Sequence, residues 1–593
     1  MRDTLLFYDV EVFKYDALVV FKDINNNEVA HFWNNRDRIG AKFPDDIPSG
    51  FEGVSDLVEQ NTLVGYNNFH YDDYIISAMM NPVMAKVELI KRLNDNIISG
   101  SGSTIKVNPI IDSIDVMQQI SVSRPSLKQI EGNMGKSIIE SSVPFDIDSP
   151  LTDEQRQEVL EYCRYDVEST IEVYKLRTKS YFDTKKSLIQ LLPEDSQRKA
   201  QRWNTTTISA IILLENSKSS FWLKYRVPEK YWRNVPGIPD KVWDMWELSE
   251  NQENVSGKGL SEKFTAFNCE IVMGLGGLHG APKKPARYGR ILLADVGSMY
   301  PSIICSLNAL GSATAKYDAL RQERLRIKHT DKTKANALKL ILNSVYGNFK
   351  NSYSALFNPW ASGTVCIYGQ IALFTLCKKL YDNGYEIINI NTDGVAFVDN
   401  PDLGDAYDRI CREWEQEFSG LLLEIDTFDK WIQKDVNNYI ALQGDHIKTK
   451  GGEVNKYSEN KYFDNNNARI VQMALVDKLL YNTDPLTTFV QHRHNPLLWQ
   501  YILKAGSTYT GVQDKDGLWQ NNVNRVFAAV SDVEWTKLYK VRKDGGLVNF
   551  PDVPERMFLW NGDIHDIRDF DKKLDMEHYL TIVYNKLKGW SDG

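Results

Sequence analysis

Apolar and polar residues alternate over the first 33 residues and predict a meander of short strands. The runs LLFYDVEVF, ALVVF and EVAHFW fall within residues 4–33, and the polar stretch DINNN separates the last two. A period of two is typical of half-buried strands, and Asn-rich stretches are typical of turns. A helical period begins after Thr152-Asp153-Glu154 and runs to about Tyr181. Together these patterns predict an α/β unit over roughly residues 1–185.

The middle of the chain predicts a strand, three helices and a hairpin. RYGRILLADVGS predicts a buried strand, and PSIICSLNAL a helix, both within 286–310. Residues 317–328 and 332–347 predict two helices joined by the polar turn His329-Thr330-Asp331. YEIINI and VAFVD flank Asn391-Thr392-Asp393-Gly394, and an Asp-Gly pair between apolar runs is a strong hairpin signal.

Two regions give weaker patterns. The Trp- and Pro-rich stretch 221–246 lacks a clear period, so we expect connecting structure there. After residue 452 the chain is mixed and aromatic, and it contains no motif that predicts a function.

The composition is that of an ordinary globular protein, with 593 residues, 42% apolar and 25% charged. No apolar run approaches the ~18–20 residues of a membrane span, so we expect no membrane partner. The start, MRDTLLFYDVEVF, does not follow the signal-peptide pattern. The six cysteines have neither metal-knuckle nor disulfide-framework spacing, which indicates reduced thiols in a cytoplasmic protein.

Charge is unevenly distributed. The net charge of −9 argues against general nucleic-acid binding. Residues 1–180 carry 18 cations and 29 acids, whereas residues 271–350 carry 13 cations and 4 acids. This basic segment within an acidic chain indicates either a surface for an anionic partner or a solvated helix face.

Three segments of the N-terminal region place acids where they would meet. Asp9 and Glu11 are two apart on the first strand, so both project to one face. For these two acids alone, a pair on a surface strand is the favoured explanation. VGYNNFHYDDYII adds Asp72 beside Asn67 and Tyr71, and EYCRYD adds Tyr162 and Asp166 on one helical face. Four acids (Asp9, Glu11, Asp72 and Asp166) suffice to hold two divalent ions for phosphodiester cleavage.

These segments resemble a known family. D-x-E at 9–11, N-x3-YD at 67–72 and Y-x3-D at 162–166 are similar, in order, to the three exonuclease motifs of DnaQ-like 3′–5′ proofreading domains. The stretch RPSLKQIEGNMG, which contains Ile130, is also similar to that family. The resemblance implies an RNase H-like nuclease domain in which the four acids bind two metal ions and Tyr162 orients the water.

The centre of the chain contains a second group of acids next to the basic segment. Asp295 ends the apolar strand ILLAD, and Asp393 lies at the tip of the predicted hairpin. Two metals bridging them would suit nucleotidyl transfer. Helical spacing puts a set of polar residues on facing helices: Arg321, Arg324 and Lys328, then Lys339, Asn343 and Tyr346. These helices are either a triphosphate clamp or an amphipathic hairpin with a solvated face.

Three motifs here resemble family B DNA polymerases. D-x2-S-x-Y-P-S at 295–302, K-x3-N-S-x-Y-G at 339–347 and the Thr-Asp of the hairpin at 392–393 are similar to motifs A, B and C of that family. The resemblance implies that Asp295, Asp393 and the Val296 carbonyl hold the catalytic metals. It also implies a nucleotide site in which Tyr300 excludes a 2′-hydroxyl and the other side chains hold the incoming dNTP: Arg324, Lys328, Lys339 and Asn343.

Further segments resemble the family's DNA contacts, with two departures. GLGGLHGAPKK (274–284) is similar to a glycine-rich template-contacting element, which implies DNA binding by Gly276, Gly277, Lys283 and Lys284, with Arg287 and Arg290 adding local charge. Motif C has Asn391 where the family has its first Asp. The thumb motif K-x-Y appears as Asn437-Asn438-Tyr439, so Tyr439 carries over and Lys448 and Lys450 are expected to supply the missing phosphate contact.

The sequence therefore predicts a multidomain α/β and α+β protein in which an RNase H-like exonuclease precedes a right-hand polymerase. The expected exonuclease domain is 1–185, followed by a connecting region with the glycine-rich loop at 186–285. The expected polymerase part consists of the first palm segment (286–315), short helical fingers (316–350), the second palm segment (351–440) and the thumb with the C-terminal region (441–593). Only 44 positions separate Asp295 from Lys339, and 54 separate Lys339 from Asp393, which leaves no room for inserted terminal-protein subdomains.

The expected function is primer extension with dNTPs and proofreading, in viral or plasmid-type replication. Expected cofactors are two Mg²⁺ ions at each of two sites, with Mn²⁺ as the alternative metal. Expected partners are primer-template DNA and dNTPs. The chain is expected to be a monomer in the cytoplasm, that of a bacterial host if phage-encoded, and the sequence does not identify a single-strand binding protein, helicase or clamp partner. Two alternatives remain open: a nuclease with a decayed polymerase half, and a non-catalytic DNA-binding scaffold.

Overall fold

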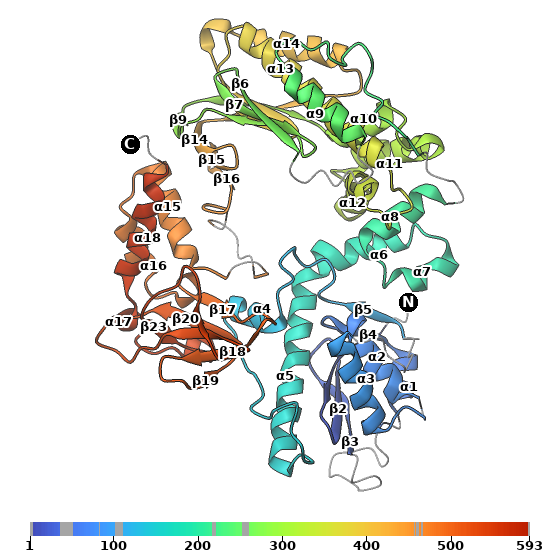
Figure 1. Ribbon diagram of the computed structural model, residues 1–593, viewed down its shortest axis with the longest axis vertical. Coiled ribbons are helices and arrows are strands. Elements are labelled where there is room, and N and C mark those ends of the chain that lie inside the picture. The colour runs from blue at the N-terminus through green and yellow to red at the C-terminus, as the bar shows by residue number, and fades with distance from the viewer. Residues whose placement is uncertain are drawn as a thin grey trace. The chain divides into compact units, whose positions relative to one another are not determined.

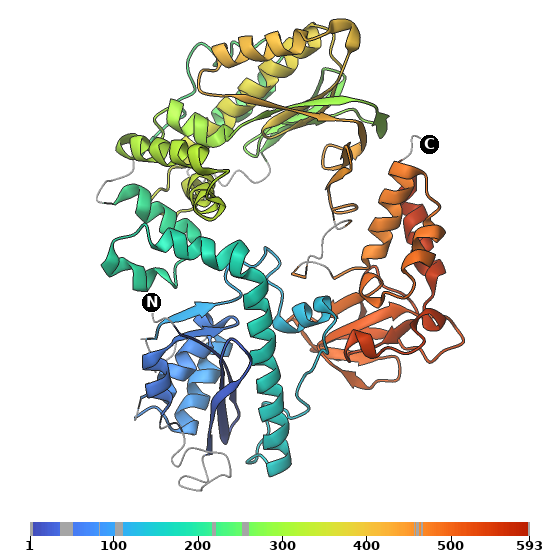
Figure 2. The same ribbon diagram turned by 180° about the vertical axis from the view of Figure 1, so that it is seen from behind.

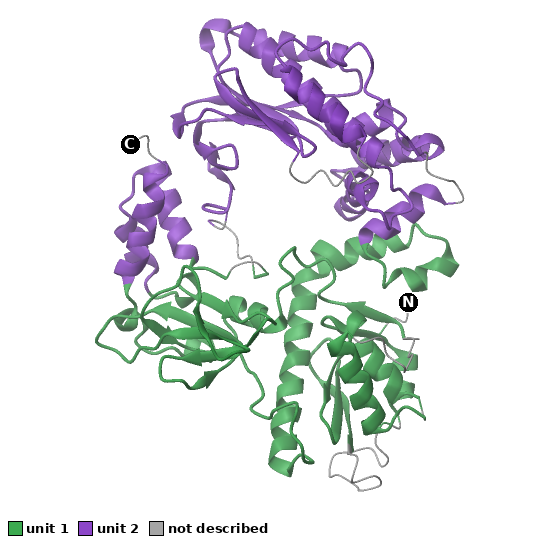
Figure 3. Cartoon of the chain, in the orientation of Figure 1, with its two compact units in different colours: residues 1–204, 461–468, 494–575 green, residues 205–460, 469–493, 576–593 purple. Residues whose placement is uncertain are grey.

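The chain forms two compact units in the computed structural model (Figure 3). Unit 1 comprises residues 1–204, 461–468 and 494–575, and unit 2 comprises residues 205–460, 469–493 and 576–593. The structure describes residues 4–35, 51, 53–81, 83–100, 111–215, 221–251, 260–455, 457, 462–463 and 466–590. The mixed α/β character with several sheets agrees with the sequence.

A five-stranded sheet organises the N-terminal part of unit 1. Its order is β3-β2-β1-β4-β5, with β1, β2 and β3 antiparallel and β1, β4 and β5 parallel. Its strands are β1 (Leu5–Val12), β2 (Asp16–Lys22), β3 (Glu28–Asn35), β4 (Thr62–Gly65) and β5 (Ser113–Asp115). The predicted meander is confirmed.

Helices cover both faces of this sheet (Figures 1 and 2). Tyr8 and Val10 face a core that includes residues of α1 (Val54–Gln60), α2 (Asp72–Met79) and α3 (Val87–Ser99). Phe7 faces the opposite core, which α5 (Asp153–Arg177) supplies with Val159 and Val167. Thr152 caps α5 by accepting the Gln155 N–H, as the Thr-Asp-Glu start predicts. Since Asp9 and Glu11 alternate with Tyr8 and Val10, they lie on the α5 face.

The rest of unit 1 includes a β-rich C-terminal lobe, residues 494–575. Its first sheet has the order β17-β20-β23, and its second the order β19-β18-β21-β22. The strands are β17 (Tyr501–Lys504), β18 (Tyr509–Asp514), β19 (Trp519–Gln520), β20 (Val523–Ala528), β21 (Leu538–Arg542), β22 (Leu547–Asn549) and β23 (Met557–Leu559). The unit's other helices are α4 (Leu127–Met134), α6 (Asp183–Ile189), α7 (Glu194–Ala200) and α17 (Phe570–Lys573), and a π-helix over Thr178–Phe182. The range 441–593 is thus divided between both units.

A seven-stranded antiparallel sheet forms the core of unit 2. Its order is β13-β10-β12-β11-β8-β7-β6, so β10 lies between β12 and β13. Its strands are β6 (Ser261–Ala266), β7 (Cys269–Gly274), β8 (His279–Ala281), β10 (Ile291–Val296), β11 (Ile387–Asn391), β12 (Gly394–Val398) and β13 (Leu423–Phe428). The predicted strand and hairpin are confirmed as β10 and β11–β12.

Helices and a small sheet complete unit 2. The predicted helical pair is confirmed as α11 (Thr314–Ile327) and α12 (Lys332–Lys350). The other helices are α8 (Thr205–Leu214), α9 (Asp240–Glu250), α10 (Met299–Ser306), α13 (Pro359–Asp382), α14 (Ala406–Glu417), α15 (Arg469–Tyr481), α16 (Pro485–His492) and α18 (Met576–Lys588). The small sheet has the order β16-β15-β14-β9, with β9 (Ala286–Tyr288), β14 (Lys430–Asp435), β15 (Asn438–Gln443) and β16 (His446–Lys450).

Two helices of unit 2 differ from expectation or need explanation. The stretch 221–246, expected to be connecting structure, contains most of α9, where Trp243 and Trp246 are buried at helical spacing in place of an aliphatic pattern. Among the described residues α13 alone is long and apolar enough to cross a membrane, but 89% of its most apolar window is buried. It packs against β11, β12 and α14, which is typical of a core helix.

Candidate functional sites

The first site is a cluster of carboxylates in unit 1, between β1, α2 and α5. β1 presents Asp9 and Glu11 to α5, which carries Asp166, and Asp72 is the first residue of α2. Three of the acids are buried: Glu11 is 6%, Asp72 7% and Asp166 8% exposed. Ligand atoms of Asp9, Glu11 and Cys163 lie within 4.8 Å of one another, which forms a group able to hold a metal ion.

Burial and mutual repulsion disfavour negative charge in this cluster. Burial, and next the charge of Asp166, raise the pKa of Asp9 to about 7. Burial is also the main cause that raises the pKa of Glu11, Asp72 and Asp166, and neighbouring acids add to it at Glu11 and Asp72. Mg²⁺ and similar divalent cations prefer oxygen ligands, and a group of neighbouring buried carboxylates supplies such ligands. The residues present therefore fit the metal ions that the sequence predicts.

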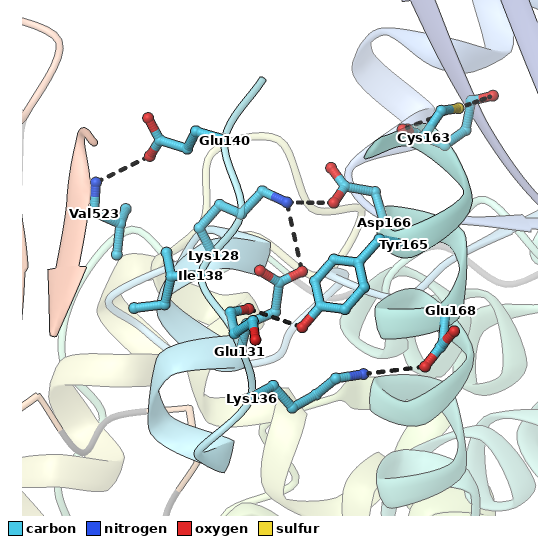
Figure 4. A network of polar contacts seen from close by, with 12 residues as sticks. Lys128, Glu131, Lys136, Ile138, Glu140, Cys163, Tyr165, Asp166, Glu168 and Val523 are labelled. Atoms are coloured by element: carbon cyan, nitrogen blue, oxygen red, sulfur yellow. Dashed lines mark hydrogen bonds and ion pairs between the residues drawn. The ribbon is translucent and has the colours of Figure 1, made fainter. Parts of the chain in front are cut away.

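Lys128 is part of this site and was missed by the sequence analysis. It lies on α4, is buried, and forms an ion pair with Asp166 (Figure 4). Its Nζ is also 3.5 Å from the Glu131 carboxylate and 4.6 Å from the centroid of the Tyr162 ring. The available signal was a lysine two residues before Ile130, in a stretch that resembles the nuclease family.

The other predicted residues of this region have mixed positions. Tyr162 lies close to the cluster, with its ring next to Lys128. Burial, and next the negative charge of Asp166, raise the pKa of Tyr162. Asn67 has a left-handed backbone and donates its N–H to Asp115, 2.8 Å away. Tyr71 donates its hydroxyl to Asn94, and burial and then Asp72 raise its pKa. Cys163, which the sequence analysis did not single out, lies with its Sγ 3.8 Å from Asp9 Oδ2.

The second site lies in unit 2 at the end of β10. Asp295 is in register with Gly394 of β12, and the Val296 N–H donates to the Asp393 carbonyl over 2.7 Å. Burial, and next the charge of Asp393, raise the pKa of Asp295 to about 6. A Cβ at Gly394 would lie 2.9 Å from Asp295 Oδ1, so a side chain at this position would displace the carboxylate.

A cavity of about 590 Å³ at this point gathers residues from all three predicted motifs. It is lined by both acids, by Val296 and Tyr300 from the β10–α10 segment, and by polar residues of α11 and α12: Arg321, Arg324, Lys328, Lys339, Asn343 and Tyr346. The Tyr300 and Tyr346 rings are 4.4 Å apart, and Arg324 Nη1 is 3.5 Å from Ser298 Oγ. The two helices therefore turn their cationic side chains into a space that also contains two acids, which is suited to a metal-bound polyphosphate.

Glu424 is a third acid of this cavity, and sequence analysis missed it. It lines the cavity and is in register with Asp295 on the neighbouring strand β13. Its charge and that of Asp426 contribute to the raised pKa of Asp295. The available signal was the alternation of acids in the strand LLLEIDTF.

The residues predicted to contact DNA lie outside the lining of this cavity. Gly277 approaches the hairpin, since a Cβ there would be 3.2 Å from Thr392, whereas a Cβ at Gly276 would meet nothing within 4 Å. Lys283 and Lys284 are exposed after β8. Arg287 donates to the Leu479 carbonyl over 3.1 Å, and Arg290 pairs with Asp399.

The thumb-motif residues lie on the small sheet. Tyr439 is buried and stacks on Trp431 with 4.4 Å between ring centroids, and burial, with smaller effects from Asp393 and Asp295, raises its pKa to about 12. Lys450 lies over the Tyr439 ring and Lys448 over Phe428. Asn391 donates to Asn389 Oδ1 over 3.2 Å. Their roles at DNA stay predictions.

No protein-family model and no curated protein matches the chain. Among solved structures, it is similar to the family B DNA polymerase from the hyperthermophilic archaeon Pyrobaculum calidifontis. The identity is 13%, the match covers 99% of this chain and 78% of that chain, and the TM-score is 0.42. A likeness this remote assigns neither a fold nor a function, so both sites are interpreted from their own residues.

Proposed function

We propose that the chain is a template-directed DNA polymerase that extends nucleic-acid primers with dNTPs and proofreads with a 3′–5′ exonuclease. One observation carries the proposal. Residues from three motifs spread over almost 100 positions, including Asp295, Lys339 and Asp393, line one cavity. An amphipathic helical hairpin with a solvated face would not turn its cations towards two acids on a separate sheet.

The polymerase site would hold its metal through Asp295, Asp393 and the Val296 carbonyl. Bound Mg²⁺ would supply charge stabilisation at the α-phosphate during in-line attack by the primer 3′-hydroxyl. The chain's own part is to bind and orient the triphosphate. Arg324, Lys328 and Lys339 would neutralise its oxygens, Asn343 would line the nucleotide site, and Tyr300 would exclude a 2′-hydroxyl by its bulk.

The nuclease site would use Asp9, Glu11, Asp72 and Asp166 to hold metal ions that activate water and stabilise the leaving oxygen. Tyr162 would orient the attacking water. Lys128 would balance part of the charge of the four acids and hold Asp166 in place. A mispaired primer end would reach this site as a single strand.

Further features of the proposal come from the sequence. We propose Mg²⁺ as the metal at both sites, with Mn²⁺ as the alternative, in a monomer that acts in the cytoplasm. A compact polymerase of this kind fits replication of a viral or plasmid-type genome. The first segment of unit 1 would be the RNase H-like domain, and the seven-stranded sheet with α11 and α12 would be the palm and fingers.

Incorporation of labelled dNTP on a primed template tests the proposal. We expect Mg²⁺-dependent extension, little incorporation when only rNTPs are supplied, and degradation of single-stranded DNA when nucleotides are absent. Asp166→Ala is the control for the nuclease and should abolish degradation alone. Degradation without extension would support the alternative of a nuclease with a decayed polymerase half. A wild-type chain with neither activity would support the alternative of a non-catalytic DNA-binding scaffold.

A further inference from the structure

Residues 132–140 lie between α5 and the C-terminal lobe (Figure 4). On the α5 side, the Tyr165 hydroxyl donates to the Ser137 carbonyl over 2.8 Å, and Lys136 Nζ donates to Glu172 over 2.6 Å. The same side of α4 presents Lys128 to Asp166. This segment is therefore attached directly to the helix that carries a predicted metal ligand.

The C-terminal lobe holds the same segment from the other side. The Ile138 N–H donates to the Asn561 carbonyl over 2.7 Å, and the Ile564 N–H donates to the Gly135 carbonyl over 2.9 Å. The Glu140 carboxylate accepts the N–H groups of Asn522 and Val523 at 2.8 and 3.0 Å. These bonds join parts of the chain about 380 to 430 residues apart, and all of them involve backbone groups whose direction is fixed.

Two glycines permit this close approach. A Cβ at Gly132 would lie 2.8 Å from Ile502 Cδ1, and a Cβ at Gly135 would lie 2.8 Å from Ile564 Cγ2. Gly135 also has φ +84°, which ends α4 in a left-handed cap. The end of α4 is thus packed against the lobe without space for a side chain.

Arg525 of β20 is the central group of this junction. It is fully buried, and its guanidinium donates four hydrogen bonds to uncharged carbonyl oxygens. The acceptors are Gln500 Oε1 (2.9 Å), Gly562 O (2.7 Å), Gly132 O (3.1 Å) and Lys136 O (2.6 Å). Burial lowers the pKa of Arg525 to about 10. The last two acceptors lie at the carboxyl end of α4, where a cation also interacts favourably with the helix dipole.

We propose that the C-terminal lobe is a structural part of the nuclease site, and that Arg525 is a positioning residue that places Lys128 beside Asp166 by holding the end of α4. Lys128 and Gly132 are about one helical turn apart on α4. A displacement of the Arg525-bound end moves Lys128 with it, because α4 is a single short helix. The inference rests on the proposed nuclease function, and it gives residues 494–575 a role that neither the sequence nor that function assigns.

A double-mutant cycle in the full chain tests the proposal. Arg525→Met should lower the kcat for degradation of single-stranded DNA with Mg²⁺ roughly 10- to 100-fold, the usual effect of losing a residue that orients a metal-site group. Primer extension should not change. Arg525→Lys should retain intermediate nuclease activity, because one ammonium cannot make all four bonds. Arg542→Met, an exposed arginine on β21 of the same lobe, is the matched control and should leave both activities unchanged.

The cycle separates positioning from general damage. If Arg525 acts through Lys128, the Lys128→Met/Arg525→Met pair should be no slower than Lys128→Met alone. Independent effects that multiply would overturn the proposal. A wild-type nuclease rate in Arg525→Met together with a strong loss of rate in Lys128→Met would also overturn the proposal. That result would leave the proposed nuclease function intact. A wild-type chain without any nuclease activity would refute both.

A second variant covers the case in which Arg525→Met does not fold. Glu140→Gln keeps the side chain's shape but offers one acceptor oxygen in place of two to the N–H groups of the lobe. We expect a smaller fall in nuclease kcat, roughly threefold to tenfold, that again disappears in the Lys128→Met background. An unchanged nuclease rate in Glu140→Gln would count against the lobe's role.

Discussion

Replacing Lys128 by methionine removes a cation from among buried acids and keeps an unbranched apolar chain that is one atom shorter. The Lys128 and Asp166 side chains are both 11% exposed, and Glu131, which is 1% exposed, lies 3.5 Å from Lys128 Nζ. We expect Lys128→Met to destabilise unit 1 when no metal is bound, because two buried carboxylates then lose the cation that faces them.

The size of the effect follows from the burial of the pair. Breaking a buried ion pair by removing one partner costs about 3–5 kcal/mol, because a buried charge remains unpaired. At about 2–4 °C per kcal/mol, the melting temperature of the transition that includes unit 1 falls by roughly 6–20 °C. The loss of stability should be smaller at pH 5 than at pH 8. Burial raises the pKa of Asp9 and of Glu131 to about 7, so both carboxyl groups are protonated and uncharged at pH 5.

Thermal unfolding in EDTA at pH 8 and pH 5 measures this effect. Lys14→Met is the matched control, because Lys14 and Asp148 form an exposed pair on the same unit, with side chains 43% and 74% exposed. Such a pair contributes about 0–1 kcal/mol. The reasoning is refuted if Lys128→Met melts within about 2 °C of wild type at pH 8, or if it loses as much stability at pH 5 as at pH 8.

Four further outcomes are expected. Asp393→Ala should slow primer extension by about 100-fold or more while degradation of single strands persists, whereas the exposed Asp402→Ala should change neither; unchanged extension in Asp393→Ala would remove this residue from the metal site. Lys339→Met should raise the KM for dNTP roughly tenfold to 100-fold in steady-state extension assays, because a charge-assisted hydrogen bond to phosphate is lost, and an unaltered KM would contradict the clamp. Tyr300→Ala should increase rNTP incorporation on the order of tenfold or more by opening the space for a 2′-hydroxyl, and continued exclusion of rNTPs would show that another residue selects the sugar. Stability in EDTA should fall as pH rises from about 4 to 7, because the folded state, with the pKa of Asp9 at about 7, binds more protons there than the unfolded state. Excess Mg²⁺ should therefore raise the melting temperature more at pH 8 than at pH 5, and equal increases would argue against metal binding by ionised acids.

The local elements could be predicted because they depend on short-range patterns. The first three strands, the Thr152 start of α5 and the Asp-Gly hairpin follow from periodicity and turn chemistry over a few residues. Helical spacing likewise placed Arg324 and Lys328 on one face of α11, and the structure puts both in the cavity. In the stretch 221–246 this approach was insufficient, because α9 buries tryptophans rather than a regular aliphatic face.

Residues that belong to a site only through long-range packing could not be predicted in this way. Glu424 joins Asp295 through strand pairing between segments about 130 positions apart, and Lys128 meets Asp166 only because α4 packs beside α5. Neither contact leaves a local period in the sequence.

The sequence by itself determined which residue types are present for two candidate metal sites and in which secondary-structure elements they lie, since strand and helix periods are local properties. Only the tertiary structure decided which cation faces which acid, how residues 441–593 divide between the units, and that Arg525 holds the end of α4. The physical reason is that burial and the pairing of charges depend on groups brought together from distant parts of the chain, and these set the pKa values and contacts on which both sites depend.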